Sequence, residues 1–412
     1  MSLMAIAWRN LTNRVLQSFM TIFVVGLAVA LALVVVLLSE GVQTGINRAA
    51  EPYDLIIGGK GSAQQLVINT VLLQGNPLQN VPFELYEKLQ TDPGLTSVVP
   101  LGYGDNYHKH KIVGTKAQFF DFRNKPNDPL YFQLGQGRVF RQPFEAVIGA
   151  EAAKKLGLTP GQKFNAEHGD EVALPGEEDH DDHEANPYTV VGILKPTDSP
   201  ADLGIYVDIA SYWKIHEHAA PPVGDPTGPN AVTAILVKPK VFPNDLYRVQ
   251  NQINSGRLTR EAQAVIPYNE LYNLNQLVGQ GQQILSFVAY IAIAMAGATV
   301  FLSLYGAIIE RRRDLAVLRA LGAGQPRVFR IVLIEAGLVA GLGVVFGVAL
   351  GHLAAWLISL AIRDANAIQV ILGFPAQEPF LLLAVLLLGL LAGILPALAA
   401  YRTEAARYLA PA

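Results

Sequence analysis

The chain has 412 residues, of which 51% are hydrophobic and only 16% are charged, and its formal net charge is −3. This composition is too apolar for an ordinary soluble protein, and the excess of acidic over basic residues between positions 39 and 281 argues against a nucleic-acid partner. Cysteine is absent, and a chain that can bury a core of this size does not require disulfides.

The first 17 residues combine apolar side chains, such as Leu3 and Leu11, with the basic residues Arg9 and Arg14. This pattern predicts a short interfacial helix at the cytoplasmic surface of a membrane. A charged flank that only sets the topology of the following segment explains the pattern equally well.

Four stretches are long and apolar enough to cross a bilayer core, which takes about 20 residues at about 1.5 Å each. They are residues 19–38, 284–309, 336–362 and 380–400. The first has too long an apolar run for a cleaved signal peptide and lacks a small-x-small cleavage site, so we interpret it as an uncleaved anchor. We therefore predict a membrane protein with four transmembrane α-helices and one large aqueous domain between the first two.

Apolar residues at helical spacing continue beyond the two spans that flank this domain. Val42 and Ile46 follow the first span, and Leu271 precedes the second. Because the same pattern occurs at both positions, we predict that residues 18–46 and 269–309 are continuous helices that form a stalk. Amphipathic helix ends that merely cover the surface of the domain are the alternative.

Helical and strand-like patterns alternate within residues 47–268. The helical pattern of residues 82–95 is followed by the strand-like segment 96–103, and residues 187–196 and 230–239 also have strand patterns. We therefore predict an α+β extracytoplasmic domain with two subdomains.

Histidines and carboxylates are concentrated in residues 167–184 of this domain. Nitrogen and oxygen donors of this kind suit Zn²⁺, and an acidic insertion without a metal is the alternative. No H-E-x-x-H motif occurs, so a zincin-like enzyme has no basis. His108 and His110, elsewhere in the domain, are expected to share a strand face. The candidate zinc ligands are His168, Asp179, His180, Asp182 and His183.

A cluster of charged residues ends the second span, and an amphipathic pattern that closes at Gly322 follows at once within residues 310–330. A short helix here is suited to contact a soluble partner, whereas a topology anchor that meets anionic lipid headgroups explains the arginines equally well. The residues assigned to a coupling helix are Arg311, Arg312, Arg313, Asp314, Leu315, Leu318, Arg319, Leu321 and Gly322.

Residues 331–412 hold the last two spans. Glu335 and His352 are ionisable residues inside the third span and are functional candidates, although a neutral histidine packed among glycines is an alternative for His352. We expect Glu335 to pair with Arg327, with Arg330 or with a donor on a neighbouring helix. Small residues at four-residue spacing predict close helix packing in lipid, and here they are Gly337, Gly341, Gly343, Gly347 and Gly351.

The segment "ERRRDLAVLRALGAGQPRVFRIVLIEAGLVAGLGVVFGVALG", residues 310–351, resembles the signature of MacB/FtsX-type ABC-transporter permeases. The segment "AVIGAEAAKKLGLTPGQKF" is similar to the periplasmic core domain of the same family. The resemblance covers nearly the whole chain and departs mildly from the family pattern at Asp314, where glutamate is usual.

The resemblance implies a permease that pairs as a dimer and binds two copies of a separate ATPase subunit, which holds ATP and Mg²⁺. Hydrolysis then moves the outer domains through the stalk, and substrate is handled on the outer side. The absence of a G-x-x-x-x-G-K-[ST] motif agrees, because this chain has no P-loop for ATP phosphates.

Arginine placement predicts the orientation. The basic residues of the N-terminus, the 310–330 loop and the tail favour the cytoplasm, so both termini are expected inside and the large domain in the periplasm of a bacterium with the chain in its inner membrane. The predicted organisation is 1–17 interfacial helix, 18–46 first span and stalk, 47–268 periplasmic core domain, 269–309 stalk and second span, 310–330 coupling loop, and 331–412 last two spans and tail.

We therefore predict an ABC-transporter permease subunit that works by mechanotransmission on an envelope substrate, with a possible metal link. A membrane-anchored metal-binding module without an ATPase is the alternative, and a small-solute channel fits poorly because the spans hold few ionisable residues. Expected partners are the ATPase, a second copy of the chain in a homodimer, membrane lipids, and a periplasmic substrate-binding or adaptor protein. The cargo does not follow from the sequence.

Overall fold

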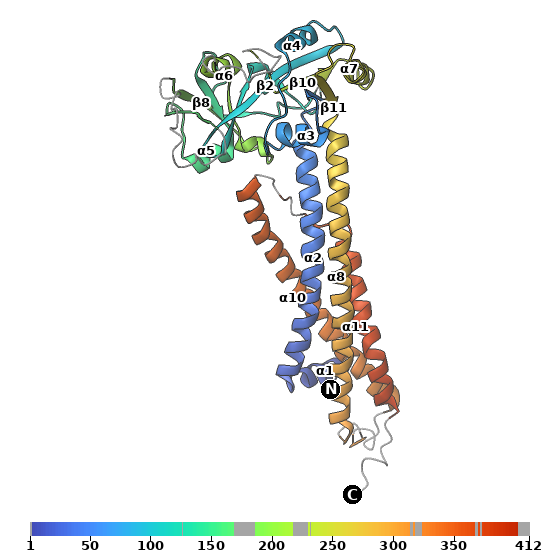
Figure 1. Ribbon diagram of the computed structural model, residues 1–412. Helices are drawn as coiled ribbons and strands as arrows, with labels where there is room; N and C mark the ends of the chain where they lie inside the picture. Colours follow the sequence, from blue (N-terminus) through green and yellow to red (C-terminus); the bar gives the residue numbers. More distant parts are fainter. Residues whose placement is uncertain are drawn as a thin grey trace, which may run out of the picture. The chain divides into compact units, whose positions relative to one another are not determined.

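The computed structural model describes residues 2–125, 127–168, 186–216, 230, 232–313, 316–317, 324–366, 370 and 373–402. The chain divides into two compact units, whose elements are labelled in Figure 1. The helical unit comprises Met1–Gly41, Val278–Ala361 and Val370–Ala412, and the sheet unit comprises Val42–Leu277 with Ile362–Gln369.

The helical unit is built from α1 (Leu3–Thr12) and from four long helices, α2 (Val15–Ala50), α8 (Pro267–Glu310), α10 (Gln325–Asn366) and α11 (Glu378–Tyr401). By length and composition, each of these four could cross a membrane, as predicted for the four apolar stretches. The helices α2 and α8 each continue without a break into the sheet unit, which confirms the predicted helical extensions.

Small residues set the spacing between the long helices. A Cβ added at Gly347 would lie 2.5 Å from Cβ of Val29, and one at Gly343 would lie 2.5 Å from Cγ1 of Val25. Gly351 likewise faces Leu33, so three of the five predicted glycines lie against α2. Such close approach leaves no room for a side chain at Gly343 or Gly347.

The other two glycines have different surroundings. A Cβ at Gly337 would be 3.3 Å from Leu390 of α11, whereas Gly341 has nothing within 4 Å of that position. The contact between α10 and α11 depends instead on Gly389 and Gly393, which lie against Ala340 and Ala336, and which the spacing argument on α10 did not identify.

The sheet unit contains one sheet of 11 described strands in the order β11-β1-β10-β2-β3-β9-β5-β8-β4, with β6 paired to β8 and β7 to β2. The strands are β1 (Leu55–Gly59), β2 (Leu95–Tyr107), β3 (His110–Thr115), β4 (Leu134–Gly137), β5 (Glu145–Ile148), β6 (Lys163–Phe164), β7 (Glu167–His168), β8 (Tyr188–Leu194), β9 (Ile205–Asp208), β10 (Ala234–Pro239) and β11 (Ala262–Val265).

The long strand β2 joins the two halves of this sheet. Its first part pairs with β10, and its second part pairs with β3 and β7. Three clusters of buried apolar side chains fill the faces. Whether the two halves act as two subdomains stays a prediction.

The helices of this unit are α3 (Ala63–Val71), α4 (Phe83–Gln90), α5 (Ala150–Leu156), α6 (Ile209–His216) and α7 (Asn244–Asn254), with the short 3₁₀ helices η1 (Ala117–Asp121) and η2 (Pro200–Leu203).

Two local sequence predictions in this unit can be compared with the structure. Gly157 ends α5 in the left-handed conformation (φ 66°), as its position after the helical pattern predicted. The expectation that His108 and His110 share a strand face was wrong. His108 and Lys109 both have positive φ and form the two-residue turn between β2 and β3, so only His110 lies in a strand.

Candidate functional site

Glu335 lies on α10 near its N-terminal end, and its side chain is only 5% exposed. The amide nitrogen of Asn10, on α1, donates a hydrogen bond to Oε1 of Glu335. The same oxygen lies 3.4 Å from Nη1 of Arg311, which directly follows α8. A buried carboxylate is costly unless it is paired, and here it has both a cation and a neutral donor. We call Asn10, Arg311 and Glu335 the Glu335 cluster.

Neighbouring polar contacts join the same helices. Arg14 forms an ion pair with Glu310, the last residue of α8. The amide of Gln17 donates to the carbonyl oxygen of Ser303 (3.1 Å), and the hydroxyl of Thr21 donates to the hydroxyl of Ser303 (2.9 Å). Segments from α1, α2, α8 and α10 are therefore tied together at one end of the helical unit.

The prediction that Glu335 has a partner is confirmed for one of its options, a donor on a neighbouring helix. Arg327 and Arg330 are not spaced three or four residues from Glu335, which is the spacing at which side chains meet on one helix. Asn10 lies 325 residues away in the chain, and no local pattern connects the two.

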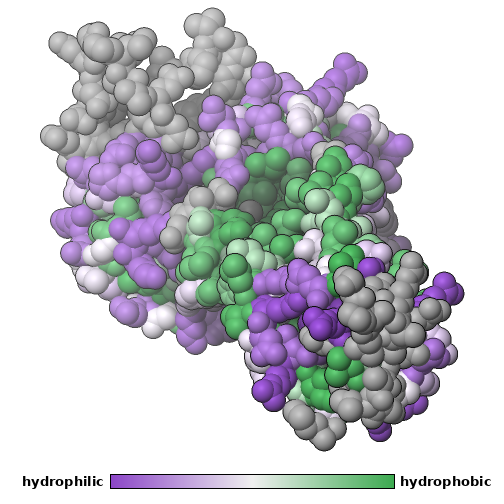
Figure 2. All heavy atoms as spheres, turned by 90° about the horizontal axis from the view of Figure 1, so that it is seen from below, coloured by the Kyte–Doolittle hydropathy of each residue, from purple (hydrophilic) through white to green (hydrophobic). Residues whose placement is uncertain are grey.

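Within the predicted coupling helix, the structure describes residues 311–313 and 316–317, and it assigns helix to residues 312–313 and 316–317. Arg311, a member of the Glu335 cluster, is half-buried, whereas Arg313 is exposed. Seen from below in Figure 2, hydrophilic side chains gather at the end of the helical unit, whereas hydrophobic side chains cover much of its flanks. The residues of this prediction that lie outside the described part of the chain are Asp314, Leu315, Leu318, Arg319, Leu321 and Gly322.

His352 occupies the other half of α10. Its Nδ1 is 3.1 Å from the carbonyl oxygen of Val348, and its Nε2 is 3.7 Å from Oε2 of Glu378, in the first turn of α11. Glu378 is 7% exposed at its side chain. The sequence argument considered His352 alone and missed Glu378, although an acidic residue directly before the fourth span was a usable signal.

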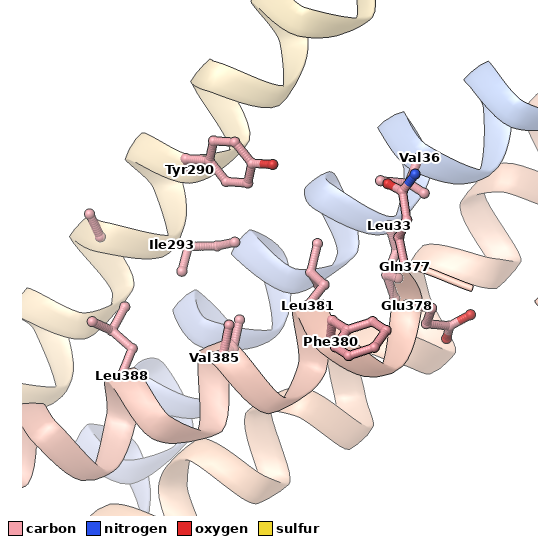
Figure 3. Close-up of a pocket in the computed structure, with 12 residues that line it drawn as sticks. Leu33, Val36, Tyr290, Ile293, Gln377, Glu378, Phe380, Leu381, Val385 and Leu388 are labelled. Atoms are coloured by element: carbon pink, nitrogen blue, oxygen red, sulfur yellow. The ribbon is translucent and has the colours of Figure 1, made fainter. Parts of the chain in front are cut away.

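An apolar pocket of about 440 Å³ lies beside this pair, between α2, α8 and α11. Figure 3 shows its walls, with Leu33 from α2, Ile293 from α8 and Val385 from α11. Gln377 and Glu378 also line it and supply polar groups. Its volume and lining are those of a site for an apolar ligand or lipid chain.

The candidate zinc ligands fall mostly where the structure gives no description. Asp179, His180, Asp182 and His183 lie outside the described residues, and His168 is known only as the end of β7, paired with Asp105 of β2. Within the ranges that are described, no group of three or more potential metal ligands occurs.

Two buried carboxylates of the sheet unit have opposite pKa shifts. Arg138 binds Glu145 through two hydrogen bonds, of 2.7 and 2.5 Å, and the backbone amide of Arg141 donates to the same carboxylate. The guanidinium and the backbone donors lower the pKa of Glu145 to about 2. By contrast, burial raises the pKa of Asp202 to about 6, although Thr197 and Asp198 donate hydrogen bonds to it.

Comparisons with known proteins match both units. The model of the MacB-like periplasmic core domain matches residues 18–255, and the model of the FtsX-like permease C-terminal region matches residues 286–405. A probable export ATP-binding/permease protein MacB of Pseudomonas entomophila is 25% identical over 73% of this chain and 42% of its own length. The macrolide export ATP-binding/permease protein MacB of Shewanella oneidensis is 24% identical over 96% of this chain and 58% of its own length.

The chain thus spans about half the length of the curated relatives it matches. Among solved structures, the periplasmic region of MacB from Actinobacillus actinomycetemcomitans aligns with a TM-score of 0.37 and 12% identity, over 55% of this chain and 94% of that one.

Proposed function

Because this chain belongs to the MacB/FtsX-like family of ABC-transporter permeases, we propose that it couples a partner ATPase to movement of its sheet unit. ATP is bound and hydrolysed by that partner, since this chain contains no G-x-x-x-x-G-K-[ST] motif. The curated relatives combine ATP binding and permease activity in their names, and export is the direction of transport that we propose here. The comparisons give no support to a metal-binding module that works without an ATPase.

The Glu335 cluster is the observation that carries this proposal. It joins α1, the end of α8 and the start of α10, and it therefore flanks the segment that holds the proposed coupling helix. A partner that pushes on this segment acts on three helices that are already held together. Rigid helices with discrete packing arrangements are suited to carry such a displacement.

The continuity of α2 and α8 supports mechanotransmission. Both helices run from the helical unit into the sheet unit, and there Ile46 and Leu271 are buried in the largest apolar cluster. An unbroken hydrogen-bonded helix is suited to carry a displacement from one end to the other. We propose that these extensions are the stalk.

The proposed topology places both termini in the cytoplasm and the sheet unit in the periplasm, with four crossings of the bacterial inner membrane. The concentration of arginine at the N-terminus, in residues 310–330 and in the tail supports it. We further propose that two copies of the chain pair in the membrane and that a periplasmic adaptor or substrate-binding protein contacts the sheet unit.

Leu318→Asp tests the coupling role. The substitution places an unpaired charge in the proposed contact, which costs several kcal/mol of association, of order 100-fold or more in affinity. Full-length chain is purified from its native membranes with the bound ABC ATPase, which is quantified by mass spectrometry. Gln325→Asp, which adds the same charge at the start of α10, is the matched control and should retain the ATPase. If Leu318→Asp retains it as well, the coupling helix is misassigned.

A further inference from the structure

A second pocket, of about 480 Å³, lies within the sheet unit where the edge strand β11 meets α7 and the first turn of α8. Figure 1 shows these three elements next to one another, with α8 starting directly after β11. Unlike the pocket of Figure 3, it is lined mainly by polar side chains, namely Lys60, Gln250, Asn254, Gln263, Asn269 and Glu270.

The edge strand β11 forms one wall of this pocket. Lys60 donates its backbone N–H to the carbonyl oxygen of Glu261, and the register pairs Gly59 with Ala262 and Ile57 with Ala264. In an antiparallel ladder the hydrogen-bonded pairs alternate, so the backbone groups of Ala262 and Ala264 point away from β1.

One of these two positions is already occupied by α7. The side chain of Asn254 donates to the carbonyl oxygen of Ala264 (3.0 Å) and accepts from its N–H (2.8 Å). This bidentate contact prevents another strand from pairing along the whole of β11. Ala262 is itself buried, so the pocket offers side chains rather than a free strand edge, and it suits a small ligand rather than an added strand.

The charges around the pocket are opposite and unpaired. Across the described residues, the side chains of Lys60, Asn269 and Glu270 take part in no hydrogen bond or ion pair. Lys60 adjoins the Gly59 end of the β1–β11 pairing, whereas Glu270 lies beyond the other end of β11, in the first turn of α8. A ligand with one positive and one negative group can satisfy both residues at once, but a neutral or singly charged ligand cannot.

We propose that this pocket binds a small zwitterion of the amino-acid or short-peptide class. Its carboxylate is held by Lys60, its ammonium group by Glu270, and its amide groups by the side chain of Asn269. The volume accommodates a ligand of this size, because small-molecule sites span about 300–1,000 Å³. Since Glu270 belongs to α8, a bound ligand links the sheet edge to the helix that continues into the helical unit.

The test is isothermal titration of the full-length chain in detergent with alanine, dialanine and trialanine, whose relative affinities report the preferred length. N-acetyl and C-amide forms of the tightest binder remove one charge each. We expect each modification to weaken binding about tenfold. Glu270→Gln should weaken binding of the unmodified peptide about tenfold and leave binding of the N-acetyl form unchanged. Lys60→Gln should likewise weaken binding of the unmodified peptide about tenfold and leave binding of the C-amide form unchanged.

Glu261→Gln and Lys240→Gln, exposed changes that do not line the pocket, are the controls, and an unchanged Tm shows that each variant is folded. The absence of saturable binding by all three probes at millimolar concentration would overturn the proposal. Equal losses in the controls, or an equal effect of Glu270→Gln on blocked and unblocked peptides, would also overturn it. None of these results depends on ATPase capture, so the proposal stands or fails separately from the coupling role.

Discussion

The two units of the chain achieve packing by opposite means. In the sheet unit, large rings fill the core, as where Phe119 stacks on Phe132 and on Tyr206 with ring centroids 4.4 and 5.0 Å apart. In the helical unit, α2 and α10 meet through glycine at Gly343, Gly347 and Gly351. In water, the hydrophobic effect favours the burial of large apolar side chains. In lipid this driving force is missing, and close packing of helix backbones stabilises the contact instead.

The units also differ in how they hold charge. Glu145 of the sheet unit pairs with Arg138, whose side chain is 43% exposed, so solvent shares the cost of both charges. Glu335 of the helical unit is nearly inaccessible and depends on Asn10 and Arg311. Loss of one partner should therefore matter more in the helical unit than in the sheet unit.

The largest effect is expected from Gly347→Val. The added side chain overlaps Val29 and the carbonyl oxygen of Gly26, which a Cβ would approach to 2.7 Å, so α2 and α10 must separate. We expect a loss of about 3 kcal/mol, measured as a lower Tm in detergent. Gly341→Val makes the same change on the same helix in open space and should have little effect. Equal losses in the two variants would show that helix propensity, rather than packing against α2, decides the result.

A smaller loss, of about 2 kcal/mol, is expected from Arg311→Gln, because it leaves Glu335 without its cation. Thermal unfolding and coupled ATPase activity should both fall. Arg313→Gln, an exposed neighbour, is the control for thermal unfolding. In a double-mutant cycle with Glu335→Gln, the second substitution should cost much less in the Arg311→Gln background. Additive losses would mean that the two side chains do not interact.

Glu145→Gln should cost only about 1 kcal/mol at neutral pH, because Arg138 is partly in solvent. The pKa of Glu145 is lowered to about 2 from an ordinary value of 4.5, so its contribution is complete above pH 4.5 and disappears as the pH falls toward 2. The difference between wild type and variant should shrink over that range.

Urea unfolding followed by the fluorescence of Trp213 reports on the sheet unit alone once Trp8 and Trp356 have been replaced by phenylalanine. A difference in stability that does not change between pH 7 and pH 3 would contradict the pairing of Glu145 with Arg138.

The smallest expected effect is the loss of zinc binding when the candidate histidines are replaced. We propose modest, exchangeable binding by His168, His180 and His183 with carboxylate help, which should weaken as the pH falls through about 6.5 because the imidazoles must be neutral to coordinate the metal. Zinc titration of the full-length chain is compared with the triple His→Ala variant. The same stoichiometry and affinity in both would leave a solvated acidic insertion as the correct interpretation.

Patterns between near neighbours in the chain were enough to predict much of the architecture. Apolar runs located the four long helices, alternation indicated an α+β domain, and four-residue spacing identified Gly343, Gly347 and Gly351. These features depend on the regular spacing of side chains along helices and strands, which can be recognised within a short stretch of sequence.

Only the tertiary structure paired the residues that these patterns left apart. Glu335 meets Asn10 across 325 residues, and His352 faces Glu378 from another helix. The pocket with Lys60 and Glu270 combines segments separated by most of the sheet unit. Periodicity tells which face of an element is buried, but the partner of a charged side chain depends on which elements become neighbours, and that is decided by helix packing and strand order.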